Sequence, residues 1–159
     1  MKTKKSGSVE RVRAALDAYG IDSEIERFDK NTRTAAEAAS AIGCKIGQIA
    51  KSLIFRAKAT DRPVLVIVRG DGRVDEKKIA AVIGEKIGRA DPDFVRKTTG
   101  FAIGGVAPVG HIGEVICFVD SGLKEFKTVW AAAGSPNAVF QITPNDLILL
   151  SGGTLIDVC

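Results

Sequence analysis

The residues best suited to chemistry lie in a glycine-rich segment, residues 100–111, with the sequence GFAIGGVAPVGH. It contains four glycines, one proline and no acidic residue, a composition typical of an irregular connection. Glycine lets the backbone approach a ligand closely, and successive free N–H groups can bind an anion or stabilise an oxyanion. The spacing is neither Gly-x-Gly-x-x-Gly nor a P-loop. A loop that serves only its own turns would have the same composition, so the residues alone leave both interpretations open.

Other reactive side chains are sparse. The chain has one histidine, His111, and three widely separated cysteines, Cys44, Cys117 and Cys159. No Cys-x-x-Cys pair occurs, so the sequence suggests neither a zinc site nor a disulfide framework. Cys117 lies in an apolar run, where a thiol usually behaves as a small buried hydrophobe. A cysteine nucleophile would need a histidine partner, so this chemistry has little support.

The net charge of +4 does not by itself indicate a nucleic-acid-binding protein. Lys2, Lys4 and Lys5 supply three of the 23 basic residues, which leaves 20 basic against 19 acidic residues in the rest of the chain. Two windows, residues 38–60 and 94–113, contain basic residues and no acid. The basic residues and the histidine in them are Lys45, Lys51, Arg56, Lys58, Arg96, Lys97 and His111. These windows could frame a phosphate-contacting face if they are neighbours in space.

The elements that must position these residues alternate along the chain. Its 159 residues, 45% apolar and 26% charged, suit one globular domain, and no run approaches the roughly 20 apolar residues that span a bilayer. Apolar spacing and capping residues predict helices that begin near residues 9, 34, 75, 91 and 143. Strands are expected over 24–28, 52–55, 63–68, 114–120, 128–133, 138–142 and 154–158. The later strands are too close together for helical crossovers, which favours an α+β fold with a mixed, largely antiparallel, curved sheet and flanking helices.

Four blocks of the sequence, taken in order, resemble the YbaK and prolyl-tRNA synthetase-associated family of aminoacyl-tRNA editing domains. A helix is followed by a lysine near a strand start, then by a Gly-x-x-x-Pro loop, a strand with Asp-x-x-Leu, and a closing strand and helix. The blocks are residues 34–55, 104–108, 118–123, and 133–136 with 140–147. Each motif is short, and their order and spacing are the specific part. The resemblance covers most of the chain from about Thr34 onward.

The resemblance implies hydrolysis of the ester between a wrong amino acid and the terminal ribose of tRNA, usually proline tRNA. Lys51 matches the family's essential lysine, which makes it the implied catalytic residue. It would hold the terminal nucleotide by charge, because its compact ammonium suits a phosphate or a polarised oxygen. The loop backbone would hold the ester, and the water would be activated by the substrate's own ribose hydroxyl rather than by a side chain. The resemblance implies no metal and no cofactor, and His111 stays outside the catalytic set. The implied substrate-binding residues are Gly104, Gly105, Val106, Ala107, Pro108, Asp120, Gly134 and Ser135.

The sequence departs from some relatives in one respect. They carry a Gly-x-His segment near the final strand, where the histidine helps to size the amino-acid pocket, whereas residues 134–137 here read GSPN. Small amino acids differ by only about 1–3 kcal/mol per methylene in a pocket, so cysteine, alanine, serine, threonine and 2-aminobutyrate all remain candidates. Asp120 could instead cap a strand end, and Gly134 could be a turn residue.

We therefore expect a trans-acting aminoacyl-tRNA deacylase in the cytoplasm, with a basic tail at residues 1–7 and the editing domain at residues 8–159. The expected partners are the acceptor end of mischarged tRNA and, as a second candidate, prolyl-tRNA synthetase, with no membrane. A non-catalytic tRNA-binding or synthetase-associated module is the main alternative. A small-molecule pocket unrelated to tRNA is a third hypothesis, which would show binding that is insensitive to salt.

Overall fold

Helix boundaries in the computed structural model, which describes residues 7–29, 32 and 34–159, follow the capping residues of the sequence. Thr34 accepts a hydrogen bond from the backbone N–H of Glu37 at 3.1 Å, and Asp91 accepts one from Phe94 at 2.8 Å. Such bonds satisfy N–H groups that have no partner within a helix. The helices are α1 (Gly7–Ala18), α2 (Ala35–Ile42), α3 (Glu76–Ile83), α4 (Pro92–Thr99) and α5 (Pro144–Ser151).

The strands confirm those expected from the sequence and add one more. The three-residue strand β4 was not predicted, because its central Gly88 and short length give no apolar alternation. Two 3-10 helices, η2 (Ile46–Gln48) and η3 (Ser121–Glu125), were also missed. The strands are β1 (Ile25–Arg27), β2 (Ile49–Ala57), β3 (Pro63–Arg69), β4 (Ile87–Arg89), β5 (Ile116–Asp120), β6 (Val129–Ser135), β7 (Ala138–Ile142) and β8 (Thr154–Ile156).

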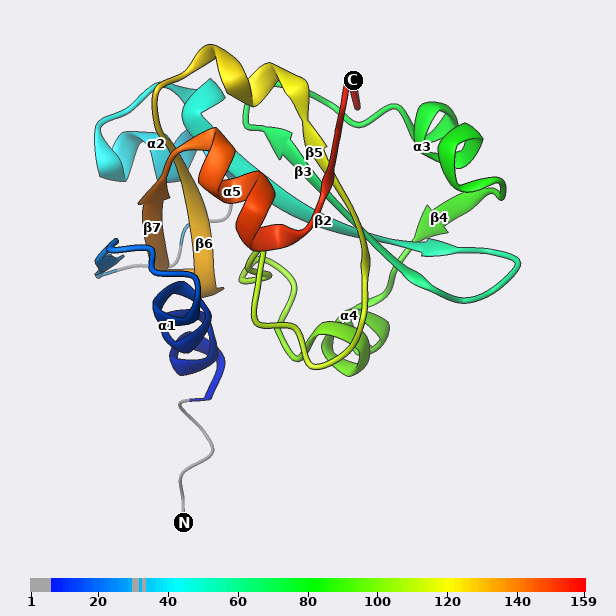
Figure 1. Cartoon of the computed structure of the whole chain (residues 1–159), viewed down its shortest axis with the longest axis horizontal. Coiled ribbons are helices and arrows are strands. Elements are labelled where there is room, and N and C mark those ends of the chain that lie inside the picture. Colours follow the sequence, from blue (N-terminus) through cyan, green and yellow to red (C-terminus); the bar gives the residue numbers. More distant parts are fainter. Residues whose placement is uncertain (1–6, 30–31, 33) are drawn as a thin grey trace.

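These strands form one mixed sheet in the order β1-β7-β6-β2-β3-β5-β8, with β4 on β2 (Figure 1). The β1–β7, β7–β6, β2–β3 and β2–β4 pairs are antiparallel, whereas β2–β6, β3–β5 and β5–β8 are parallel. The expected α+β fold with a mixed sheet and flanking helices is confirmed. The parallel pairs join strands that are far apart in the chain. Residues 70–115, with α3 and α4, separate β3 from β5, and η3, β6, β7 and α5 separate β5 from β8.

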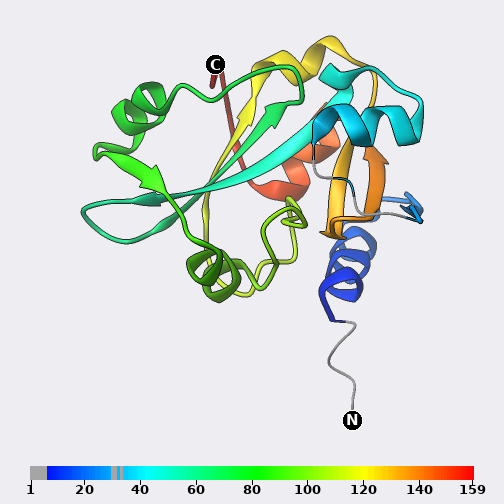
Figure 2. The same cartoon turned by 180° about the vertical axis from the view of Figure 1, so that it is seen from behind.

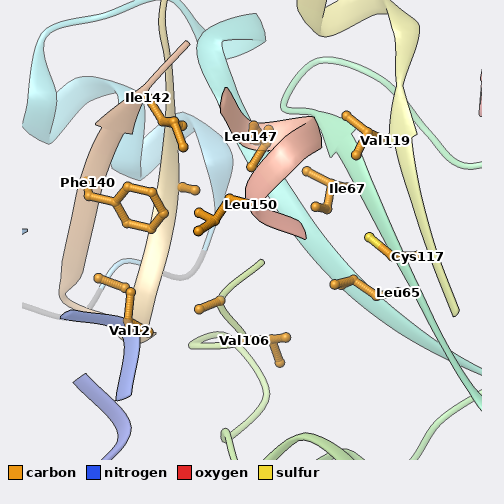
Figure 3. Packing of buried hydrophobic residues seen from close by; sticks show 14 of the residues in the cluster. Val12, Leu65, Ile67, Val106, Cys117, Val119, Phe140, Ile142, Leu147 and Leu150 are labelled. Atoms are coloured by element: carbon orange, nitrogen blue, oxygen red, sulfur yellow. The ribbon is translucent and has the colours of Figure 1, made fainter. Parts of the chain in front are cut away.

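Strand β3 is buried on both faces, as its unbroken apolar run indicates. Leu65 and Ile67 face a large core under α1, α5 and the segment before β5, in which Val12, Leu147 and Phe140 gather (Figure 3). Val64, Val66 and Val68 face a second cluster with Ile79 of α3. Figure 2 shows α2 on the side of the sheet away from α5, where it packs on Ile49 and Trp130.

The sheet contains a gap beside β2. Strand β6 pairs with β2 only at Ile49 and Ala50, and then the two strands diverge (Figure 1). On the same side of β2, β4 pairs only from Phe55 to Ala57. Among the described strands, none pairs with residues 51–54 on that side, although all four pair with β3 on the other. An interior strand of the sheet thus has a short open edge.

The expected basic tail, residues 1–7, lies outside the described residues except for Gly7, which begins α1. In the described part of the chain, no helix is long and apolar enough to cross a membrane.

The buried core should dominate stability. Phe140, in the centre of β7, is 0% exposed, so Phe140→Ala should lower the free energy of unfolding by about 3–5 kcal/mol. Leu149→Ala is the matched control, because Leu149 is 61% exposed, and it should change the free energy by less than about 0.5 kcal/mol. Urea denaturation of both variants measures the difference, and equal losses would contradict the assigned core.

Candidate functional site

A cleft of about 920 Å³ lies along the open edge of β2. The seven consecutive residues from Ile49 to Phe55 line it, as expected when the backbone edge of a strand borders one space. The first turns of α2, the middle of β6 and the loop residues Ile103, Gly104 and Val106 supply other walls. Most of the lining is small or apolar. Among the described residues that line the cleft, the charged ones are Lys51, Asp71 and Arg89.

Lys51 is the first residue of β2 after the pairing with β6 ends. Its side chain is half-buried in the cleft, and its Nζ donates to the carbonyl O of Gly72 at 3.2 Å. One of the three ammonium donors therefore has a partner from the turn at residues 70–72, and a ligand could accept from the others. The position of the cation thus depends on this turn.

Arg69 and Asp120 stabilise the turn at residues 70–72. Arg69 contacts Asp71 through Nε at 2.5 Å, and this hydrogen bond is the main reason that the pKa of Asp71 lies below its usual value. The buried carboxylate of Asp120 accepts from the backbone N–H of Arg69 at 3.1 Å and from that of Gly122 at 3.0 Å. Asp120 therefore caps the end of β5 and fixes the end of β3, and it is not among the residues that line the cleft.

The glycine-rich segment divides into a cleft wall and a buried support. Gly104 and Val106 line the cleft, as does Ser135 at the end of β6. Gly105 packs directly on that strand end, because a Cβ added to it would lie 2.9 Å from the Cα of Ser135. Ala107 and Pro108 are buried and are absent from the lining. Residue 105 must be a glycine, because any side chain would keep the loop from approaching β6 this closely.

Arg11 of α1 fastens the two ends of this segment. Its guanidinium donates to the carbonyl O of Gly110 at 3.0 Å and to that of Gly100 at 2.8 Å. The same group lies over the ring of Phe101, with 4.7 Å from Cζ to the ring centroid. A planar cation with several fixed donors can bridge two carbonyls in this way. Arg11 of α1 therefore fixes the distance between the two ends of the loop.

His111 holds the loop from inside. Its Nε2 lies 2.8 Å from the carbonyl O of Ala107, and its ring meets Phe101 edge-on with 5.8 Å between centroids. Burial lowers the pKa of His111, and the charge of Arg11 adds to the effect, while the hydrogen bond to Ala107 opposes it. The residue supports the segment and does not line the cleft.

Gly134 lies behind the cleft, where β6 meets α1. Its φ is +99°, and a Cβ would lie 2.7 Å from the carbonyl O of Ser8, so no other residue fits there without movement. The structure thus brings Lys51, Gly104, Val106 and Ser135 together. The predicted site residues that it places outside the cleft lining are Gly105, Ala107, Pro108, Asp120 and Gly134.

The two acid-free windows meet where β2 approaches α4. The guanidinium of Arg56 in the first window lies over the ring of Phe94 in the second, 4.9 Å from its centroid. Acids from other segments also reach this region, because Arg56 forms an ion pair with Asp61 at 2.9 Å. The sequence does not predict that Trp130, Arg89 and the residues of α2 line the cleft. They come together only through strand pairing, for which local sequence gives no signal.

The family model for the aminoacyl-tRNA editing domain matches residues 29–150, which include every cleft residue. The chain belongs to this family.

Named relatives agree with this membership. The "Uncharacterized protein YwhH" of Bacillus subtilis is 35% identical over 96% of this chain and 97% of its own. A solved structure, described as "a putative trans-editing enzyme for prolyl tRNA synthetase", is 38% identical with a TM-score of 0.89 over 99% of this chain and 98% of its own.

Other relatives are longer or more distant. The "Proline--tRNA ligase" of Thermoanaerobacter sp. (strain X514) is 33% identical over 64% of this chain, and the match spans only 18% of the ligase. The "Putative Cys-tRNA(Pro)/Cys-tRNA(Cys) deacylase EbsC" of Enterococcus faecalis is 23% identical over 79% of this chain and 76% of its own.

Close packing at Gly105 should be essential to the cleft wall. Gly105→Ala places a methyl group against the backbone of Ser135 and should lower the melting temperature by several degrees, because overpacking costs about 1–3 kcal/mol. Gly113→Ala is the control in the same connection, since its added Cβ would only touch the carbonyl O of Thr98 at 3.5 Å. Calorimetry of both variants checks this, and an unchanged Gly105→Ala protein would contradict the close approach.

The depressed pKa of His111 should make the loop sensitive to acid. Below about pH 6.5 the unfolded chain binds a proton at this residue that the folded chain does not, so stability falls as the pH falls. The slope from this one group is at most about 1.4 kcal/mol per pH unit. The free energy of unfolding of the wild type, minus that of His111→Gln, should therefore decrease from pH 7 to pH 5. A difference that does not change with pH would show that His111 titrates normally.

Proposed function

We propose that this protein is a hydrolase that removes a mischarged small amino acid from tRNA, with proline tRNA as the main substrate, acting in trans. The observation that carries the proposal is Lys51 in a largely apolar cleft at the gap in the sheet, which the loop residues Gly104 and Val106 also line. We assign the editing unit to residues 8–159. Family membership supports the reaction class, and the named relatives support proline tRNA.

The size and lining of the cleft suit the end of an aminoacylated tRNA. Its volume of about 920 Å³ is at the upper end of typical small-molecule sites, which leaves room for a terminal adenosine together with a small amino acid. Alanines of α2 and β6 provide small walls, and the indole of Trp130 offers a flat surface for a base or ribose. Apolar walls exclude water and strengthen electrostatic contacts to the ester.

The reaction needs few protein groups. A water oxygen adds to the ester carbonyl carbon, and the negative charge on the carbonyl oxygen is stabilised by N–H donors and by the ammonium of Lys51. The bond between the acyl carbon and the ribose oxygen then breaks, and the ribose oxygen takes up the proton that the water gives up. The products are a free amino acid and tRNA with a free terminal hydroxyl. The neighbouring ribose hydroxyl can relay the proton, so no side-chain base is required.

The choice of amino acid rests on pocket shape. Residues 134–137 provide no histidine, and Ser135 is the polar side chain that they place in the cleft lining. Cysteine, alanine, serine, threonine and 2-aminobutyrate are all small enough, and the E. faecalis relative favours cysteine. The similarity to prolyl-tRNA synthetases favours tRNA as the ligand and the synthetase as a second partner.

Lys51 provides the test. Lys51→Ala should lower kcat/KM for at least one of cysteinyl-, alanyl- or seryl-tRNA(Pro) by about a hundredfold or more, because it removes a charge-stabilising contact. Its thermal stability should stay near that of the wild type, since the side chain is only half-buried. The control is Lys124→Ala, an exposed lysine on η3 that does not line the cleft, and it should retain full activity.

Two results would overturn the proposal. One is a wild-type protein that hydrolyses no mischarged tRNA in a panel of the five small amino acids. The other is a Lys51→Ala protein that is as active as the wild type. A wild-type protein that retards tRNA in a gel without loss of the ester would identify the non-catalytic binding module instead.

A further inference from the structure

The open edge of β2 offers main-chain groups that no part of the proposed mechanism yet uses. Residues 51–54 pair with β3 on one side and with no described strand on the other. They also lie in the unbroken run of β2 residues that line the cleft. Backbone N–H and C=O groups that face a largely apolar cleft are costly unless water or a ligand binds them.

The direction of each group follows from the register. Ala57 donates its backbone N–H to Arg62 on the β3 side at 2.9 Å, and Lys58 donates to Lys86 on the β4 side at 2.9 Å. The β2–β3 register runs without a shift from Ala50 to Arg56. Because these groups alternate in direction along a strand, the N–H and C=O of Ser52 and Ile54 point into the gap. Those of Lys51 and Leu53 point to β3.

The hydroxyl of Ser52 is not available to bind a ligand in the cleft. Its Oγ is buried and has no hydrogen-bond partner among the described residues, and it shares a strand face with Ala50 and Ile54, which pack into the large core. Ser52 therefore offers the cleft its main chain rather than its hydroxyl. Lys51 is its immediate neighbour, and Gly104 and Val106 line the same space.

We propose that the aminoacyl group of the substrate binds as one residue of the strand that is missing here. Its α-ammonium donates to the carbonyl O of Ser52, and its ester carbonyl O accepts from the N–H of Ser52. This two-point contact is the pattern of a hydrogen-bonded antiparallel pair. It recognises what all amino acids share, and it leaves the side chain to be selected by pocket shape. The inference rests on the proposed function.

The N–H of Ser52 is then a donor to the developing oxyanion. The matched pair of variants is Ser52→Pro, which removes this N–H, and Ser52→Ala, which keeps it. A proline at position 52 removes no hydrogen bond between β2 and β3, because the N–H of this residue points away from β3. The single-turnover rate constant for deacylation of alanyl-tRNA(Pro) or cysteinyl-tRNA(Pro) should be about a hundredfold lower for Ser52→Pro than for Ser52→Ala.

A second measurement needs no variant. Amide hydrogen exchange of the wild-type protein, followed by NMR, should show Lys51 and Leu53 protected, with Ser52 and Ile54 exchanging faster. Adding the stable amide 3′-deoxy-3′-(L-alanylamino)adenosine should slow the exchange of Ser52. Slowing at Ser52 supports the inference even if Ser52→Pro does not fold.

The outcomes separate this inference from the proposed function. An active wild type with an equally active, folded Ser52→Pro variant would overturn the strand-like contact alone. So would binding of the amide analogue, seen at other amides, without slower exchange at Ser52. A wild-type protein that hydrolyses none of the tRNAs would overturn the proposed function and this inference with it.

Discussion

The site depends on the divergence of β6 from β2 after two residue pairs. Strands in a sheet normally satisfy their polar backbone groups along their whole length. Over residues 51–54, β2 is paired on one side, and no strand in the described part of the chain pairs with it on the other. Neighbouring elements keep the gap from closing. Helix α2 packs on Ile49 and Trp130 at one end, and β4 pairs with β2 at the other.

The opposite wall is built by tertiary contacts rather than by regular structure. The loop at residues 100–111 has little secondary structure of its own, yet its ends are fixed by Arg11 and its interior by His111. Gly105 brings it against the end of β6, and Gly134 lets α1 pack behind the same strand. A preorganised wall of this kind holds its groups in place without the cost of ordering them when a substrate binds.

Much of this fold could be predicted from the sequence. Thr34, Asp75, Asp91 and Thr143 cap helices as expected, and the apolar run of β3 is buried on both faces. Strand β4 and the strand order could not be predicted, because pairing between distant segments leaves no local pattern. The same limit applies to the site.

Lys51 and the glycine segment were recognisable as sequence motifs, and they do share the cleft through Gly104 and Val106. Asp120 was expected in the same cleft. Its hydrogen bonds instead show the alternative role, that of a cap at the end of a strand. The support given by Arg11 could not be foreseen, since 99 residues separate it from Gly110.

We propose that the aminoacyl end of tRNA binds at the gap between β2 and β6. A crystal structure of the protein with an amide-linked, non-hydrolysable aminoacyl-minihelix of proline tRNA tests it most directly. We expect the amino acid to lie along residues 51–54, between α2 and the loop wall, with Lys51 near the linkage. A minihelix end bound at any other surface, with the cleft empty, would contradict it.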